Sequence, residues 1–181
     1  MQPEQFAGAS PAFRLEQYFL GHTRAWGIVE DRFGTVRKQF VVEMAGRQDG
    51  ETFILDERFH YADGTSDHRV WQIRRRDGNT YEGTAADVVG TARGRAFGNA
   101  LNWRYRFDLP VGGRRWRVRF DDWMFLQPGG IVINRAKMRK WGFRIGELTL
   151  AFAKPGALPA AGQQPAGERE EQRVGEAAQQ L

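Results

Sequence analysis

The sequence predicts an all-β fold, an up-and-down antiparallel β-barrel of eight or nine strands with a short N-terminal helix and a disordered C-terminal tail. Apolar and polar residues alternate along most of the chain, and turn signals such as "ADGTSD", "RDGN" and "QPGG" interrupt the alternation roughly every ten residues. The chain also contains 22 Gly, 13 Phe, 6 Trp and 4 Tyr, which favours short strands joined by tight turns. A meander of this kind removes its exposed edges by closing into a barrel.

The chain divides into three expected segments. Residues 1–12 are predicted to be a flexible N-terminus, and residues 13–154 a single barrel domain. This domain begins with "AFRLEQYFL", whose two amphipathic turns predict a helix at residues 13–20. Residues 155–181 are rich in Pro, Ala, Gln and Glu and contain few large apolar residues, so they cannot offset the entropy lost on ordering. We expect this segment to be a low-complexity disordered tail.

The stretch "GTARGRAFG" (residues 90–98) carries Gly or Ala at every second position. If Gly98 and the following Asn99 form a two-residue hairpin turn, Gly94 lies opposite Trp103, and the empty positions make room for large rings. Extending the same count across the "PVGG" loop places Trp103 beside Phe120. Three strands then share one aromatic face, which fixes their register.

The next strand changes parity after Phe120, because Trp123 and Phe125 fall on the opposite face. A β-bulge at Asp121 and Asp122 would restore the pattern and bring Trp123 into the barrel. We therefore interpret the two aspartates as a structural bulge with a salt bridge to a nearby arginine. A metal site is the alternative, but neighbouring strand residues point apart and no second acidic cluster completes such a site.

Glu57 lies on an otherwise apolar strand face, in line with Leu55 and Phe59. Burial would raise the pKa of this carboxyl, which suits general acid–base work or a hydrogen bond to the polar head of a ligand. The alternative is a glutamate near the end of the barrel that reaches water or pairs with an arginine. The predicted lining of an internal cavity is Trp26, Glu57, Phe59, Trp71, Trp103, Tyr105, Phe107, Trp116, Phe120, Trp123 and Asn134.

Several kinds of chemistry are absent from the sequence. With no Cys, there is no disulfide framework, thiolate nucleophile or Cys-based zinc site. The three His show no metal-ligand spacing, and neither Ser lies in a nucleophile elbow. We therefore expect no catalytic residues, no metal and no cofactor, and predict that the protein is not an enzyme. No signal peptide or membrane span is found, so the chain as written is expected to be cytoplasmic.

An arginine-rich face is expected on the outside of the barrel. In the register that turns the rings inward, seven arginines face outward. They are Arg93, Arg95, Arg104, Arg106, Arg115, Arg117 and Arg119. Like charges set across from one another destabilise a sheet, so an anionic partner would relieve the repulsion. A solvated face rich in arginine by composition is the alternative. Nucleic acid is not expected as a partner, since single-strand binders combine rings and charges on one face.

Four stretches resemble a proteobacterial family of small proteins with a domain of unknown function. They are "TRAWGIVEDRFGTVRKQF", "DVVGTARGRAFGNALNWRY", "FDDWMFLQPGGIVINRAKMRKWG" and "GELTLAF". The resemblance implies no assigned activity, substrate, cofactor or catalytic residue. Many members are lipoproteins, so it implies a periplasmic or envelope location, although this chain lacks their signal and lipidated Cys.

The leading hypothesis is a lipocalin-like or calycin-like barrel that binds a small apolar or amphipathic molecule in its interior. The second is an interaction protein whose arginine face docks on an anionic partner or membrane surface. An enzyme that uses Glu57 as acid or base is the third. A cavity of about 300 Å³ or more would favour the first hypothesis, and a filled interior the second.

Overall fold

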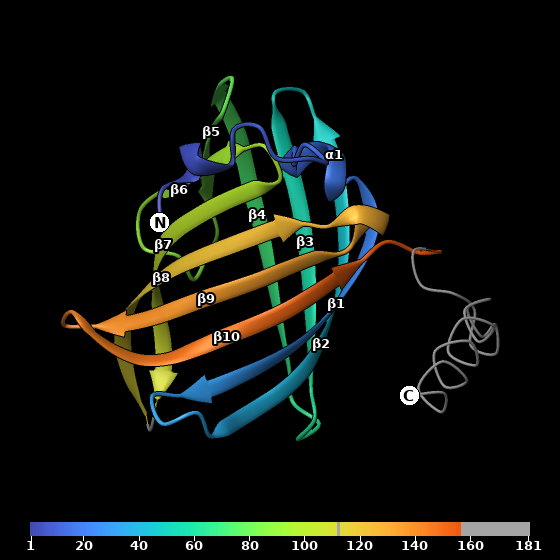
Figure 1. Ribbon diagram of the computed structural model, residues 1–181. Helices are drawn as coiled ribbons and strands as arrows, with labels where there is room; N and C mark the ends of the chain where they lie inside the picture. The colour runs from blue at the N-terminus through green and yellow to red at the C-terminus, as the bar shows by residue number, and fades with distance from the viewer. Residues whose placement is uncertain (112, 157–181) are drawn as a thin grey trace, which may run out of the picture.

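The computed structural model describes residues 1–111 and 113–156, and there the chain forms ten antiparallel strands that close into a barrel (Figure 1). Each strand pairs with the next in sequence, and β1 closes the barrel by pairing with both β2 and β10. The strands are β1 (Gly21–Asp31), β2 (Val36–Asp49), β3 (Thr52–Tyr61), β4 (Ser66–Asp77), β5 (Thr80–Thr84), β6 (Ala92–Phe97), β7 (Ala100–Val111), β8 (Arg114–Leu126), β9 (Val132–Lys140) and β10 (Phe143–Ala153).

The all-β antiparallel barrel is confirmed, but the expected strand count of eight or nine is too low. The extra strand arises where the chain makes two short strands, β5 and β6, separated by residues 85–91. Most of the expected disordered tail, residues 157–181, lies outside the described residues.

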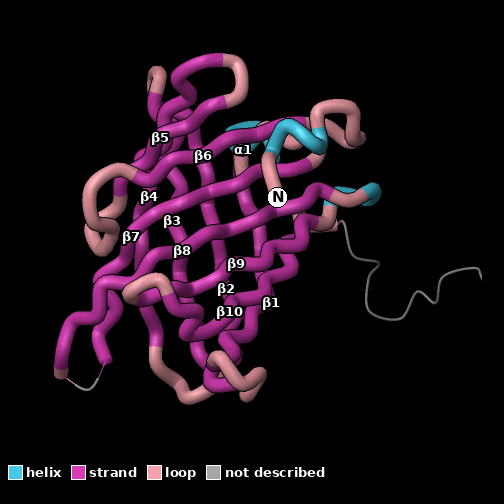
Figure 2. The backbone as a smooth tube through the Cα atoms, turned by 60° about the vertical axis from the view of Figure 1, so that its left-hand side comes forward, coloured by secondary structure: helices cyan, strands magenta, loops and turns pink. Residues whose placement is uncertain are grey.

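Three short helical segments lie at one end of the barrel: η1 (Pro3–Phe6), α1 (Leu15–Tyr18) and η2 (Pro128–Gly130) (Figure 2). The helix expected at residues 13–20 is therefore only one turn, α1. Its apolar side chains and their neighbours Phe13 and Phe19 are buried over this end. The turns β1–β2, β3–β4, β7–β8 and β9–β10 and the β5–β6 connection lie at the opposite end, called here the open end.

The small residues of β5 and β6 receive the indole of Trp103. Gly94 pairs with Trp103 as the sequence predicts, and Ala92, Gly94 and Ala96 all face the interior. A Cβ on Gly83 would lie 2.8 Å from the Trp103 ring, and one on Gly94 would overlap it. The indole therefore rests on bare backbone of two strands.

The expected bulge at Asp121–Asp122 is wrong. Pairing of β7 with β8 runs without a break from Ala100 with Phe125 to Val111 with Arg114, so Trp103 lies opposite Asp122 and not Phe120. Asp122 then faces the interior, and Trp123 and Phe125 face outward. They are apolar because Phe6 of η1 packs on them, with ring centroids 6.2 Å and 5.4 Å away.

Candidate functional site

A cavity of about 90 Å³ lies inside the barrel. Most of its wall is apolar, with Trp71 and Trp103 at right angles to one another, their ring centroids 5.6 Å apart. Besides the two indole N–H groups, five polar or ionisable side chains lie on this wall: Glu57, Arg69, Tyr105, Asp122 and Asn134. They come from the paired strands β3 and β4 and from β7, β8 and β9, which also lie next to one another, so two parts of the barrel wall contribute the polar groups.

Glu57 and Arg69 form the first part of this polar cluster. They are direct cross-strand partners, with 3.8 Å between Arg69 Nη1 and Glu57 Oε2. Arg69 Nε–H also donates to both carboxylate oxygens of Asp87, at 2.9 and 3.1 Å, and Trp71 Nε1–H donates to Glu57 Oε2 at 3.2 Å. One guanidinium thus links a buried carboxyl to a half-exposed one.

Burial raises the pKa of Glu57 to about 7, although the nearby Arg69 charge acts in the opposite direction. Burial likewise raises the pKa of Asp122 to about 8. Both carboxyls therefore take up and release protons near neutral pH, in a region where the Tyr105 hydroxyl is held neutral because burial raises its pKa well above the usual value.

Asp122 and Asn134 each leave one buried oxygen without a partner. Asp122 Oδ1 and Asn134 Oδ1 are fully enclosed and accept no hydrogen bond from the described residues. Buried polar atoms nearly always have a partner, and an unmade hydrogen bond costs about 1–3 kcal/mol. Both residues line the cavity, where Asn134 Oδ1 offers an acceptor and Asp122, which keeps its proton up to about pH 8, can accept or donate a hydrogen bond.

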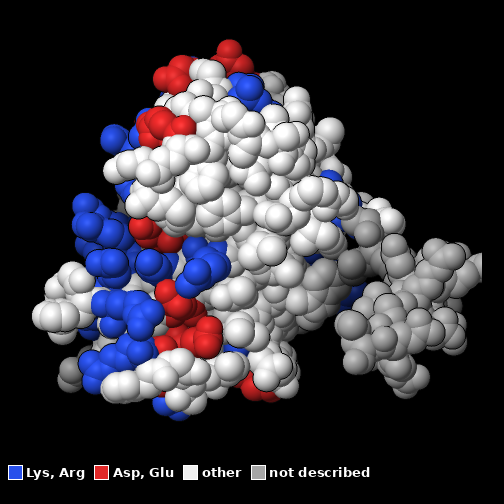
Figure 3. Space-filling view, in the orientation of Figure 1, with Lys and Arg blue, Asp and Glu red and all other residues white. Residues whose placement is uncertain are grey.

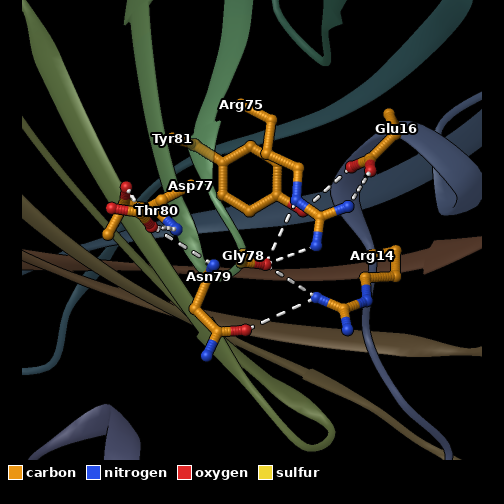
Figure 4. Close-up of polar contacts among 8 residues, drawn as sticks. All are labelled: Arg14, Glu16, Arg75, Asp77, Gly78, Asn79, Thr80 and Tyr81. Carbon is orange, nitrogen blue, oxygen red and sulfur yellow. Dashed lines mark hydrogen bonds and ion pairs between the residues drawn. The ribbon is translucent and has the colours of Figure 1, made fainter.

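The helix end of the barrel is firmly closed. Tyr18 Oη donates to the carbonyls of Gly130 and Phe152, at 3.0 and 3.2 Å. Figure 4 shows how α1 is joined to the β4–β5 turn: Arg75 pairs with Glu16 at 3.2 Å, and Tyr81 Oη donates to the same carboxylate at 2.9 Å. These contacts hold α1 over the cavity.

The open end is closed less tightly. Its inward-facing apolar side chains are only half-buried, in contrast with the buried cluster under α1; they are Phe59, Tyr61, Phe107, Leu109 and Trp116. The Arg69 guanidinium lies among them, 5.3 Å from the Phe59 ring centroid and 4.9 Å from that of Phe107. Arg69 and these rings therefore separate the cavity from the open end.

The predicted cavity residues divide into three groups. The cavity wall contains Glu57, Phe59, Trp71, Trp103, Tyr105 and Asn134. Phe107, Trp116 and Phe120 also point inward but pack in the core beside it. Trp26 and Trp123 are wrong: Trp26 is 38% exposed on the outer wall beside Arg24, and Trp123 lies outside beneath Phe6.

Sequence reasoning missed Arg69, Asp87 and Asp122. The parity of β4 carried the signal for Arg69, since it lies two residues before Trp71 on the same face. Asp122 was obscured by the expected bulge, which would have turned it outward. Asp87 lies in the β5–β6 connection, where no periodicity applies.

The seven predicted arginines lie on the outer face of β6, β7 and β8 and are exposed. Figure 3 shows Lys and Arg side chains gathered along one side of the barrel, with acidic side chains between them. Arg104 pairs with Asp121 at 3.0 Å and Arg117 with Asp108 at 2.9 Å, and Glu4 of η1 pairs with Arg95. The expected repulsion is therefore partly neutralised within the chain itself.

A family profile described as "Protein of unknown function (DUF3833)" matches residues 1–154. The chain belongs to this family. No curated protein matches this DUF3833 chain. Among solved structures it is similar to the S-type phycobiliprotein lyase CPES from Guillardia theta, with a TM-score of 0.57 and 6% identity over 84% of this chain and 96% of that one. At this identity, the similarity shows a shared barrel fold.

No helix within residues 1–111 or 113–156 is long and apolar enough to cross a membrane. In the same part of the chain, no group of three or more His, Asp or Glu is placed to hold a metal ion.

Proposed function

We propose that the interior of the barrel binds a small amphipathic molecule whose polar group donates hydrogen bonds. The observation that carries the proposal is the pair of unpartnered, buried oxygens on Asp122 and Asn134 in an otherwise apolar cavity. Ligand sites commonly combine apolar walls with a few convergent polar groups. An N–H or O–H group of the ligand would supply the missing partners, and its apolar part would lie against Trp71 and Trp103.

The size of the cavity limits how a ligand enters. A volume of about 90 Å³ is below the roughly 300 Å³ expected of a small-molecule pocket. It corresponds to roughly three water molecules and is smaller than the ~150 Å³ cavity known to bind benzene. A larger molecule requires side chains to move. Arg69 and the half-buried rings at the open end are the groups placed to do so, because the helix end is held by hydrogen bonds. Binding is therefore expected to displace Arg69 toward the open end.

The fold comparison supports this proposal only in outline. A protein of similar fold is named a phycobiliprotein lyase, so a barrel of this kind occurs in a protein that acts on another molecule. The ligand of this chain has to be deduced from its own side chains, since the two sequences share 6% of their residues.

Glu57 provides a second candidate function. A carboxyl with a pKa of about 7 beside a cavity is poised for general acid–base catalysis near neutral pH. If this is its role, the bound molecule is converted, and Glu57→Gln abolishes conversion while leaving binding intact. Mass spectrometry of the molecule before and after incubation separates the two functions.

The test uses two valines that follow one another on β2. Val42 lines the internal cavity, whereas Val41 lies on the outer wall. We expect wild-type protein to bind the apolar fluorophore N-phenyl-1-naphthylamine, Val42→Phe to weaken binding at least tenfold, and Val41→Phe to leave it unchanged. Near-UV circular dichroism confirms that both variants are folded. Weakening by Val41→Phe alone, or no binding by wild-type protein, would contradict an internal site.

The polar part of the site is tested with a pair of ligands. 1-Naphthol donates an O–H that naphthalene lacks, so it should bind several-fold more tightly to wild-type protein. Asn134→Leu removes one acceptor and should reduce this preference. Equal affinity for the two ligands would show that the unpartnered oxygens take no part in binding.

A further inference from the structure

Three aromatic side chains are exposed at the open end to an extent unusual for such residues. Phe33 is 77% exposed, Trp141 86% and Phe143 75%. Phe33 lies in the β1–β2 turn, and the other two lie in or directly after the β9–β10 turn. Since β10 pairs with both β9 and β1, the two turns are neighbours. The exposed rings therefore belong to one region of the surface.

Trp141 is also held in an unfavourable backbone conformation. Its φ is 50°, and it is the only described residue besides glycine with a positive φ. Glycine or asparagine is preferred in this region, and a bulky residue there is an outlier that stores strain. A side chain that costs stability and is not buried by any of the described residues indicates a contact beyond them.

Cations surround these rings. The β9–β10 turn reads "RKWGFR" from Arg139 to Arg144, and the β1–β2 turn places Arg32 over Phe33, 4.5 Å from the ring centroid. Lys140 Nζ lies 4.3 Å from the Trp141 ring centroid. Of the acidic residues where β1 and β10 meet near these turns, Asp31 and Glu147 are in ion pairs, and Glu30 has none among the described residues.

A row of arginines continues from the turn across the outer face. Arg144 pairs in register with Arg139, Arg139 with Arg119, and Arg119 with Arg106, over four adjacent strands. Arg144 has an ion pair with Glu147, whereas within the described residues Arg106, Arg119 and Arg139 have none. On the face seen in Figure 3, Lys and Arg side chains gather along one side of the barrel.

We propose that this end of the barrel docks on a lipid bilayer that contains anionic lipids, with Phe33, Trp141 and Phe143 inserted at the interface and the arginine row facing the headgroups. Exposed Trp and Phe flanked by Arg and Lys are the composition of interfacial anchors. Each cation near an anionic surface strengthens attachment about fivefold. Docking goes beyond the proposed ligand binding, and places the open end of the cavity at the bilayer.

The experiment is co-sedimentation of the full chain with vesicles of phosphatidylcholine alone or mixed with phosphatidylglycerol. We expect binding to the mixed vesicles, weakened by salt, and little binding to phosphatidylcholine alone. Trp141→Asn should lower vesicle affinity about tenfold while leaving the melting temperature unchanged or higher, because asparagine tolerates positive φ. Trp26→Ser, at an exposed tryptophan on the barrel wall, is the matched control and should not change affinity.

A second pair of variants tests the arginine row. Arg139→Glu should lower affinity at least tenfold, and Arg47→Glu, at an exposed arginine near the helix end, should have little effect. An equal loss of vesicle affinity in Arg139→Glu and Arg47→Glu would overturn the proposal. Unchanged vesicle affinity in Trp141→Asn would overturn it as well. Binding to soluble heparin as tight as to vesicles would also overturn it, because it would show that charge alone is recognised. 1-Naphthol binding is measured separately on the same variants, so failure of docking and failure of the internal site remain distinguishable.

Discussion

Arg69 faces Glu57 across β3 and β4, and both side chains point into the barrel. Arg69 is held on its other side by Asp87 and lies among the rings of the open end. The same residue therefore stabilises a buried carboxyl and closes the cavity. A change at Arg69 is therefore expected to alter both the charge balance of the interior and access to the cavity.

Removal of Arg69 should be costly, and more so at high pH. Arg69→Met leaves Glu57 without its cation, and breaking a buried pair typically costs about 3 kcal/mol or more. Arg69 lowers the pKa of Glu57, so without it the carboxyl holds its proton to a higher pH. The loss of stability in urea unfolding should then be larger at pH 9 than at pH 5.

A double variant checks this explanation. Adding Glu57→Gln to Arg69→Met removes the unpaired carboxyl. The double variant should therefore lose less unfolding free energy than the sum of the losses in the two single variants. Strict additivity with no pH dependence would contradict a direct interaction between the two side chains.

Asp122→Asn should stabilise the protein at alkaline pH. Burial raises the pKa of Asp122 to about 8, against about 3.9 in the unfolded chain. The folded state therefore holds a proton that the unfolded state releases, and stability falls as pH rises from about 4 to about 8. The variant should remove this slope and gain about 3 kcal/mol at pH 8 relative to pH 5.

Asp108→Asn serves as the control for that measurement, because the hydrogen bond from Arg117 lowers the pKa of Asp108. Its stabilising effect is present above the unfolded pKa and is lost as pH falls through the folded pKa. This variant should lose stability at neutral pH. A gain at pH 8 from both variants would show that a general charge effect, and not burial of Asp122, is responsible.

Gly94→Ala should destabilise the barrel by about 1–3 kcal/mol, the usual cost of overpacking. Its Cβ would overlap the Trp103 ring, which rests on the backbone there. Gly78→Ala is the control, because a Cβ at Gly78 meets nothing within 4 Å. Thermal unfolding compares the two. If Trp103→Phe does not relieve the cost of Gly94→Ala, the overlap is not its cause.

Phe6→Ala should cost about 1–2 kcal/mol, since the ring packs on Trp123 and Phe125 and aromatic pairs contribute beyond their buried area. Phe33→Ala, at an exposed ring, should cost little in stability. Equal effects on the melting temperature would mean that η1 does not cover the outer face in solution.

The sequence predicts those parts of the fold that depend on periodicity. Gly94 opposite Trp103 follows from a two-residue turn and strict alternation, and both are local properties. The register of β7 with β8 could not be counted across "PVGG", because the number of loop residues left unpaired depends on how tightly the chain turns. The predicted register was therefore off by two residues. Trp103 was placed on the correct face of the sheet, but opposite Phe120 and not Asp122.

The outward aromatics were assigned to the wrong face for a different reason. Trp123 and Phe125 are apolar because η1, far away in sequence, covers them, and alternation alone assigns such residues to the interior. The bulge invented to turn them inward then hid Asp122, one of the two carboxyls in the cavity. Glu57 was placed correctly because its strand, β3, has no outward-facing Phe or Trp to disturb the alternation.

The most direct test of an internal site is a ¹H–¹⁵N spectrum of the tryptophan indoles during titration with 1-naphthol, with signals assigned by single Trp→Phe variants. The six indoles sample distinct places: Trp71 and Trp103 line the cavity, Trp116 lies near the open end, and Trp26, Trp123 and Trp141 lie outside. Binding inside the barrel should shift the Trp71 and Trp103 signals first and most strongly. Shifts confined to Trp26 or Trp141 would place the ligand on the outer surface and contradict the proposed function.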